Sequence, residues 1–183
     1  MKHSLEQLIE KRQSGKKIKF LFFWGHRPLK DGSIGASCFS QWWPCQFKVN
    51  DQLYYSAEHW MMHQKAELFG DTEIGNEILN SKSPAKAKQL GRKVKNFDVK
   101  LWDEKKYEIV KEGNRYKFSQ NEELKTFLLN TKKRVLVEAS PVDPIWGIGM
   151  ANDHRDVEKP EKWRGQNLLG FALMEVRDKL EKK

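Results

Sequence analysis

One stretch decides which fold is expected: residues 56–66, which read SAEHWMMHQKA. Ser56 is a residue type that caps helix N-termini, and Gly70-Asp71 is a typical helix end. The stretch therefore predicts a helix that runs through Phe69.

Around it, the chain adds further helices and a few short strands. Helices are predicted over residues 4–13, from Pro84 onward, over 102–112 with Gly113 as the stop, over 121–130 and over 167–180. Strands are predicted over 18–24 and 135–137, with a hairpin of 47–49 and 53–55 around a polar turn. The pattern predicts a mainly α fold of the α+β class, a compact helical domain with a small β-sheet or hairpin.

The central helix carries two charged residues on one face. Glu58 and Lys65 are seven residues apart, about two helical turns, so both point the same way with Met61 and Met62 between them. A carboxylate and an amine are costly to bury unless they pair or line a pocket. The residues alone leave two interpretations open. Both groups belong to a site, or Glu58 only complements the helix dipole while Lys65 stays in water.

Composition excludes several protein classes. The 183 residues are 38% hydrophobic and 32% charged, with a mean hydropathy of −0.79. No apolar run approaches the ~20 residues that span a bilayer, and the first residues lack the apolar core of a secretion signal. With two cysteines no disulfide framework is possible, so we expect a cytoplasmic protein that does not associate with membranes. Seven Trp, ten Phe and four Tyr argue against disorder.

Positive charge is concentrated in one segment. The net charge is +9. Residues 82–106 hold nine basic side chains against three acidic ones. This segment is either a solvated helix face, a surface that attracts a phosphorylated small molecule, or a contact for nucleic acid, and the sequence does not choose among these.

Three further motifs are candidates for a binding site. Trp146 and Gly147 lie in the run PIWGIG, residues 144–149, where glycines beside an aromatic residue let backbone and indole approach a flat ligand. Arg164 precedes a helix that Asn167 is predicted to cap, which is a workable phosphate site, although an ordinary capped loop explains it equally well. Trp102 lies in a basic helix, where a core position is the more common explanation.

A metal site is not expected. His59 and His63 have the i, i+4 spacing of zinc ligands, but Glu58 precedes the first histidine, whereas in zincins the glutamate directly follows it. No third ligand completes a recognisable pattern.

Taken together, these segments resemble the NADAR family, also called the YbiA-like family. The resemblance covers about residues 18–180, and its order and spacing are specific although each piece is weak alone. We accordingly expect an N-terminal helical extension over residues 1–17 and a NADAR domain over 18–183. The matching pieces are residues 23–26, 38–43, 55–62, 65–66, 84–92, 102, 117–121, 136–140, 146–149 and 164–170.

The resemblance implies an N-glycosidase, a hydrolase that needs no cofactor. Family members are similar to enzymes that cleave the C–N bond between ribose 5-phosphate and an aminopyrimidine intermediate of riboflavin synthesis, or that remove ADP-ribose from guanine bases of nucleic acid. By position, the resemblance assigns Glu58, Lys65 and Asp143 to catalysis. Trp102 and Trp146 would be aromatic residues of the pocket, and Gly147, Arg164 and Asn167 would also contact substrate. Ile148 stands where some members have Asp, so any role of that carboxylate is absent here.

A second class of function stays open at this point, a module that binds ADP-ribose or NAD without turning it over. The pair of Glu58 and Lys65 argues against it, because a pure binder needs neither group. The sequence does not reveal which N-riboside is the substrate, whether Lys65 forms a Schiff base, or the oligomeric state.

Overall fold

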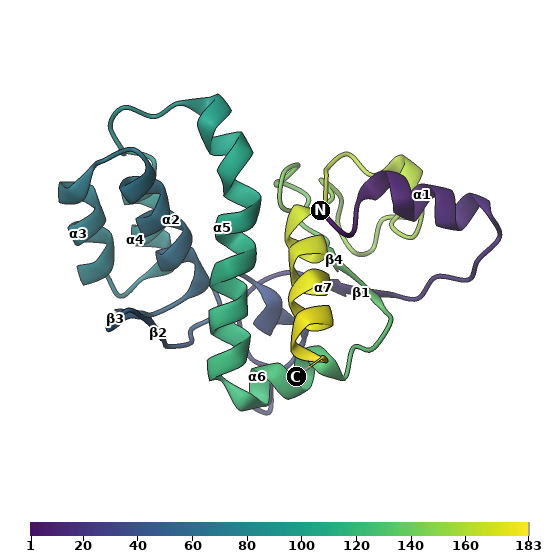
Figure 1. Ribbon diagram of the computed structural model, residues 1–183. Helices are drawn as coiled ribbons and strands as arrows, with labels where there is room; N and C mark the ends of the chain where they lie inside the picture. Colours follow the sequence, from purple (N-terminus) through teal and green to yellow (C-terminus); the bar gives the residue numbers. More distant parts are fainter. Residues whose placement is uncertain (183) are drawn as a thin grey trace. The chain divides into compact units, whose positions relative to one another are not determined.

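The computed structural model describes residues 1–182, which form seven α-helices, two short 3-10 helices and four strands (Figure 1). Contacts within the chain divide it into two compact units. The central unit is Gln41–Lys125, and the terminal unit comprises Met1–Ser40 together with the chain from Thr126 onward. Helices outnumber strands in both, which confirms the prediction of a mainly helical α+β fold with small sheets.

Four helices and one hairpin make up the central unit. Helix α2 packs against all three of the other helices. The hairpin turns at Asn50 and Asp51, with φ of +47° and +65°, the left-handed conformation that a two-residue turn requires and that Asn and Asp tolerate. The elements are β2 (Phe47–Val49), β3 (Gln52–Tyr54), α2 (Ala57–Leu68), α3 (Thr72–Asn80), α4 (Pro84–Gly91) and α5 (Val99–Gln120).

Glycine lets two helices approach α2 closely. A Cβ at Gly91 of α4 would lie 2.1 Å from Sδ of Met62, and one at Gly113 of α5 would lie 2.3 Å from Cδ1 of Trp60. The prediction that Gly113 ends a helix was therefore wrong, because α5 continues to Gln120. Glycine disfavours the interior of a helix by about 1 kcal/mol, and here the close packing on Trp60 outweighs that preference.

Helix α3 was not anticipated from the sequence. Asp71 follows the end of α2, as predicted, and also caps the next helix, since its Oδ1 accepts a hydrogen bond from the N–H of Ile74 at 3.3 Å. Its Oδ2 accepts another from the N–H of Lys95 at 2.9 Å. The side chain of Asp71 thus caps α3 and also binds the backbone of the segment that follows α4.

The terminal unit is built on two parallel strands. Strand β1 pairs with β4 from Phe20 opposite Val135 to Phe23 opposite Glu138. Helix α7 packs on β4, and a Cβ at Gly170 would lie 2.1 Å from the carbonyl oxygen of Leu136. The elements are α1 (Leu5–Gln13), β1 (Phe20–Phe23), β4 (Val135–Glu138), α7 (Leu168–Leu180), the 3-10 turns η1 (Ala36–Phe39) and η2 (Pro160–Lys162), and α6 (Glu122–Leu129), which spans the boundary between the units. Within residues 1–182, no helix combines the length and the apolar character needed to cross a membrane.

Candidate active site

The carboxylate of Glu58 lies at the buried N-terminus of α2. Ser56 caps this helix as predicted, with its Oγ accepting from the N–H of His59. Glu58 is the second helical residue, 3% exposed, and its N–H donates to the carbonyl of Gln41 at 2.9 Å. The partial positive charge of a helix N-terminus stabilises a negative charge at this position. A buried carboxylate held in this way is typical of a functional site.

Two buried amides lie beside the Glu58 backbone. Nδ2 of Asn114 donates to Oε1 of Gln41 at 2.7 Å and also to the carbonyl of Val110 at 2.9 Å. Within residues 1–182, Nε2 of Gln41 and Oδ1 of Asn114 are buried and have no hydrogen-bond partner. Most buried polar atoms in proteins are paired. A donor and an acceptor are therefore available here for a ligand with polar edges.

Lys65 lies further along α2 among aromatic rings. Its Nζ donates to the carbonyl of Gly91 at 2.9 Å and lies 4.1 Å from the centre of the Phe97 ring. The ring of Trp102 is 5.7 Å away, so the structure brings two of the predicted site residues together. Burial lowers the pKa of the Lys65 amine, which increases the fraction of neutral, nucleophilic amine at a given pH.

The two histidines of α2 are engaged in hydrogen bonds. Nδ1 of His59 lies 2.7 Å from Oγ of Ser56, and Nδ1 of His63 lies 3.1 Å from the hydroxyl of Tyr54. Burial lowers the pKa of both imidazoles and raises the pKa of Tyr54 to about 12. In the described chain, no three His, Cys, Asp or Glu side chains are grouped so that they could hold a metal ion.

In the terminal unit, Asp143 shapes the loop that carries Trp146. Its Oδ1 accepts from the N–H of Ile145 at 2.9 Å and from the N–H of Trp146 at 2.8 Å, which closes an Asx turn. The loop follows β4 at the carboxyl end of the parallel pair, where α/β proteins commonly bind ligands. Asp143 thus fixes the loop backbone that carries the half-buried Trp146 at this edge.

Glycines let this loop pack against the segment that carries Arg164. A Cβ at Gly147 would lie 2.8 Å from the Glu138 carbonyl oxygen, and one at Gly165 would lie 2.4 Å from the Gly147 carbonyl oxygen. The N–H of Arg164 donates to the carbonyl of Ile148 at 2.9 Å. The side chain of Arg164 is exposed, beside the backbone of the loop.

Asn167 joins this segment to β4. It caps α7 in the left-handed conformation with φ of +55°, and its side chain makes no cap hydrogen bond. Instead, Nδ2 donates to the carbonyl of Leu136 at 2.9 Å and Oδ1 accepts from the N–H of Glu138 at 3.0 Å. The side chain is fully buried. These contacts give Asn167 a positioning role, and its predicted contact with substrate stays a prediction.

The sequence-predicted residues thus form two groups, one in each unit. Glu58, Lys65 and Trp102 lie in the central unit, and Asp143, Trp146, Gly147, Arg164 and Asn167 lie in the terminal unit.

Four further side chains belong to these groups and were not predicted: Gln41, Phe97, Asn114 and Trp24. Trp24 directly follows β1 at the same carboxyl edge as the Asp143 loop and is 60% exposed. Asn114 could have been noticed in the sequence, because Asn is uncommon inside a long helix and its presence there indicates a specific role.

Comparison with known proteins places these motifs in a family. The model of the NADAR domain matches residues 22–181. The chain belongs to the NADAR family. It is 46% identical over 166 residues to N-glycosidase R617 of Acanthamoeba polyphaga mimivirus, covering 87% of this chain and 95% of that protein. It is 33% identical over 138 residues to N-glycosidase YbiA of Escherichia coli strain K12, covering 75% of this chain and 76% of that one.

A solved structure agrees with this assignment. The NMR structure of the E. coli protein YbiA matches with a TM-score of 0.71 and 28% identity, over 91% of this chain and 88% of that one. Family membership and these relatives confirm the predicted enzyme class, a hydrolase acting on N-glycosyl compounds. The division into an extension over residues 1–17 and a domain over 18–183 stays a prediction.

Proposed function

We propose that this NADAR protein hydrolyses the C–N bond between a phosphorylated ribose and a base, with Glu58 as the catalytic carboxylate. One observation carries the proposal: a buried glutamate at the N-terminus of α2, next to two buried amides with an unused donor and an unused acceptor. The candidate substrates are an aminopyrimidine ribotide of riboflavin synthesis and ADP-ribosylated guanine. Both present a polar base edge and at least one phosphate.

Glu58 suits the charge that develops during this reaction. As the C–N bond breaks, C1 of the ribose gains oxocarbenium character, and a fixed carboxylate in a poorly solvated place stabilises that positive charge. The same carboxylate can accept a proton from the water that attacks C1. Gln41 and Asn114 would bind a base edge through the two unused atoms.

Lys65 would supply a nucleophilic amine. The neutral amine attacks C1, the C1–N bond breaks, and the base leaves with one proton. The bond between C1 and the ring oxygen then opens, the ring oxygen takes up the second amine proton, and an imine joins Lys65 to the sugar. Water adds to C1, and expulsion of the amine releases the sugar as an aldehyde. The lowered pKa of Lys65 supports this route.

The remaining predicted residues would hold the substrate. In the central unit, Trp102 would stack on a flat group. In the terminal unit, Trp146 would offer a second ring, the exposed Arg164 would bind phosphate, and Gly147 would let the loop backbone approach a ligand. Asp143 would act by holding this loop in shape through its two hydrogen bonds to the backbone.

Product analysis tests the proposal. The protein is incubated separately with an aminopyrimidine ribotide and with an oligonucleotide that carries ADP-ribosylated guanine, and the products are identified by mass spectrometry. We expect cleavage of one substrate class. The ribotide would give the free aminopyrimidine and ribose 5-phosphate, whereas the oligonucleotide would release ADP-ribose and regain unmodified guanine. If both substrates bind and neither is cleaved, the chain is a binding module and the proposal is wrong.

Trapping with borohydride tests the imine. Reduction during turnover should leave a stable sugar adduct on the peptide that contains Lys65. Lys65→Arg keeps the positive charge but cannot form the imine, so it should abolish both adduct and turnover. If Lys65→Arg retains near-full activity, Lys65 only binds the substrate and water attacks C1 directly.

A further inference from the structure

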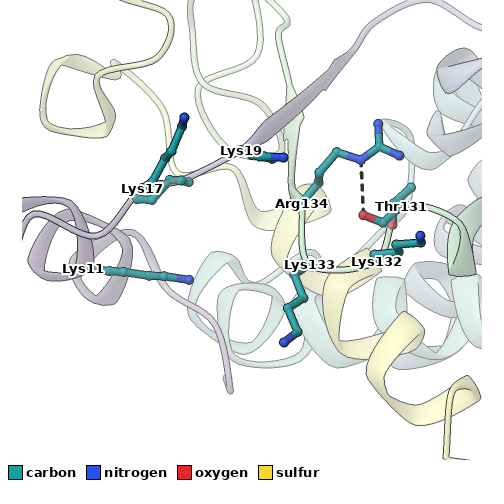
Figure 2. A pocket seen from close by; sticks show the side chains of 8 residues that line it. Lys11, Lys17, Lys19, Thr131, Lys132, Lys133 and Arg134 are labelled. Atoms are coloured by element: carbon teal, nitrogen blue, oxygen red, sulfur yellow. Dashed lines mark hydrogen bonds between the residues drawn. The ribbon is translucent and has the colours of Figure 1, made fainter.

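A basic hollow in the terminal unit lies apart from Asp143 and Trp146, two candidate site residues of the same unit. Its volume is about 660 Å³. Figure 2 shows that its walls come from α1, from the segment before β1 and from the turn before β4. The lining residues are Lys11, Lys17, Ile18, Lys19, Thr131, Lys132, Lys133 and Arg134.

The hollow lies at the amino ends of the two parallel strands. Residues 17–19 lead into β1 and residues 132–134 lead into β4, and the N–H of Val135 donates to the carbonyl of Lys19 at 2.9 Å. Asp143 and Trp146 follow the carboxyl end of β4, so the length of a strand separates them from the hollow. Three of the lysines also precede residue 22, where the match to the NADAR family begins.

Buried contacts hold the turn of the hollow in place. Nη1 of Arg177 donates to Oγ1 of Thr131 and to the carbonyl of Arg134, both at 2.8 Å. Nε of Arg134 donates to the carbonyl of Thr131 at 3.2 Å, the dashed line in Figure 2. Lys132 has a φ of +52°. The turn is therefore fixed while Lys132 and Lys133 extend into solvent.

The charge of the hollow is uncompensated. Its lining contains no acidic residue, and within residues 1–182 none of its six cationic side chains forms an ion pair. A neighbouring hollow of about 430 Å³ differs, because its Arg12 pairs with Glu161 and its Lys159 pairs with Asp156. In the basic segment 82–106, Lys95 and Lys106 also pair with acids.

We propose that this hollow binds the phosphodiester backbone of a nucleic acid without reading its bases. Figure 2 shows the charged ends fanning out around the hollow instead of converging on one point, which suits an anion with many separated charges. Double-stranded DNA carries one negative charge per ~1.7 Å of helix axis. No aromatic side chain lines the hollow, so it offers no ring on which a base could stack. Like charges held this close repel each other, and a polyanion relieves that repulsion.

Fluorescence anisotropy with labelled oligonucleotides of random sequence, single-stranded and duplex, tests this proposal without reference to catalysis. We expect affinity to fall steeply between 50 and 200 mM salt, by up to about 10³-fold if six phosphates are contacted. Lys17→Glu with Lys133→Glu should weaken binding at least ~10-fold at low salt and make the salt slope shallower by about 2.

A matched control distinguishes an effect of the hollow on oligonucleotide binding from an effect of the protein's net charge. Lys86→Glu with Lys93→Glu changes the net charge by the same amount on exposed residues of the central unit, and it should leave oligonucleotide binding close to that of the unaltered protein. Equal weakening by both pairs would overturn the proposal. Binding of tripolyphosphate in the hollow with no binding of either oligonucleotide would also overturn it, because the ligand would then be a compact anion. If the oligonucleotides bind in the hollow as expected, the ratio of duplex to single-strand affinity identifies which form of nucleic acid the site prefers.

Discussion

Replacing Asn167 by Ala should destabilise the terminal unit. The change removes the donor for the Leu136 carbonyl and the acceptor for the Glu138 N–H, at 2.9 and 3.0 Å in a fully buried position. Each buried group left without its partner costs about 1–3 kcal/mol, so the free energy of unfolding should fall by about 2–6 kcal/mol. Alanine also tolerates the φ of +55° less well than Asn, which adds to the loss.

Urea unfolding followed by circular dichroism measures this loss. Asn167→Gly, which accepts a positive φ, isolates the contribution of the two hydrogen bonds. Asn121→Ala is the control, because Asn121 also makes two hydrogen bonds, to Gln46 and Lys117, but is only half-buried. Water can replace its partners, so the expected loss is about 1 kcal/mol. An Asn167→Ala protein of unchanged stability but raised KM would refute this reasoning and make Asn167 a substrate contact.

Three further predictions concern the central unit. If Lys65 reacts as a neutral amine, kcat/KM should rise with pH through a pKa below the ordinary 10.5, and this limb should be absent in any residual activity of Lys65→Arg. Burial lowers the pKa of His59 and His63, so the free energy of unfolding should reach its full value above about pH 6.5 and decline as the pH falls toward their lowered pKa values. Melting temperatures at pH 7.5 and 5.5 measure this decline. The double variant His59→Gln with His63→Gln should show a smaller difference between the two pH values. Gly113→Ala should destabilise by about 1–3 kcal/mol because the new Cβ meets Trp60, whose Nε1 is held by Ile109. Gly75→Ala, with neighbours at 3.6 Å, should instead be neutral or stabilising in the same unfolding assay.

Local signals in the sequence predicted much of the secondary structure. Ser56 and Ser83 cap helices because a short hydroxyl side chain accepts from backbone N–H groups, and Asn50-Asp51 turns a hairpin because both residues tolerate positive φ. These effects act within a few residues. Gly113 gave a misleading signal, because its reason for being glycine is Trp60, which lies far away in the sequence.

From the sequence, candidate site residues could be named only where a local motif or the family resemblance pointed to them. The spacing of Glu58 and Lys65 on one helix face left two interpretations open, and only resemblance to a family favoured a site. The glycines beside Trp146 marked it as a candidate, whereas Asp143 was assigned by the resemblance alone. Gln41, Phe97 and Asn114 join the site through contacts between separate elements. The basic hollow also forms between segments that are far apart in the sequence, since residues 11–19 and 132–134 meet only when β1 pairs with β4.

The most direct test of the central claim is the rate of N-glycoside cleavage by Glu58→Gln, measured on the same preparation as its melting temperature. The substitution keeps the size and one acceptor oxygen of the side chain but removes the charge that stabilises an oxocarbenium ion, so turnover should fall by about 10²–10³-fold with little change in melting temperature. Glu67→Gln alters an exposed carboxylate of the same helix and should keep normal turnover. Normal turnover by Glu58→Gln together with a lowered melting temperature would contradict the account, because Glu58 would then only complement the dipole of α2.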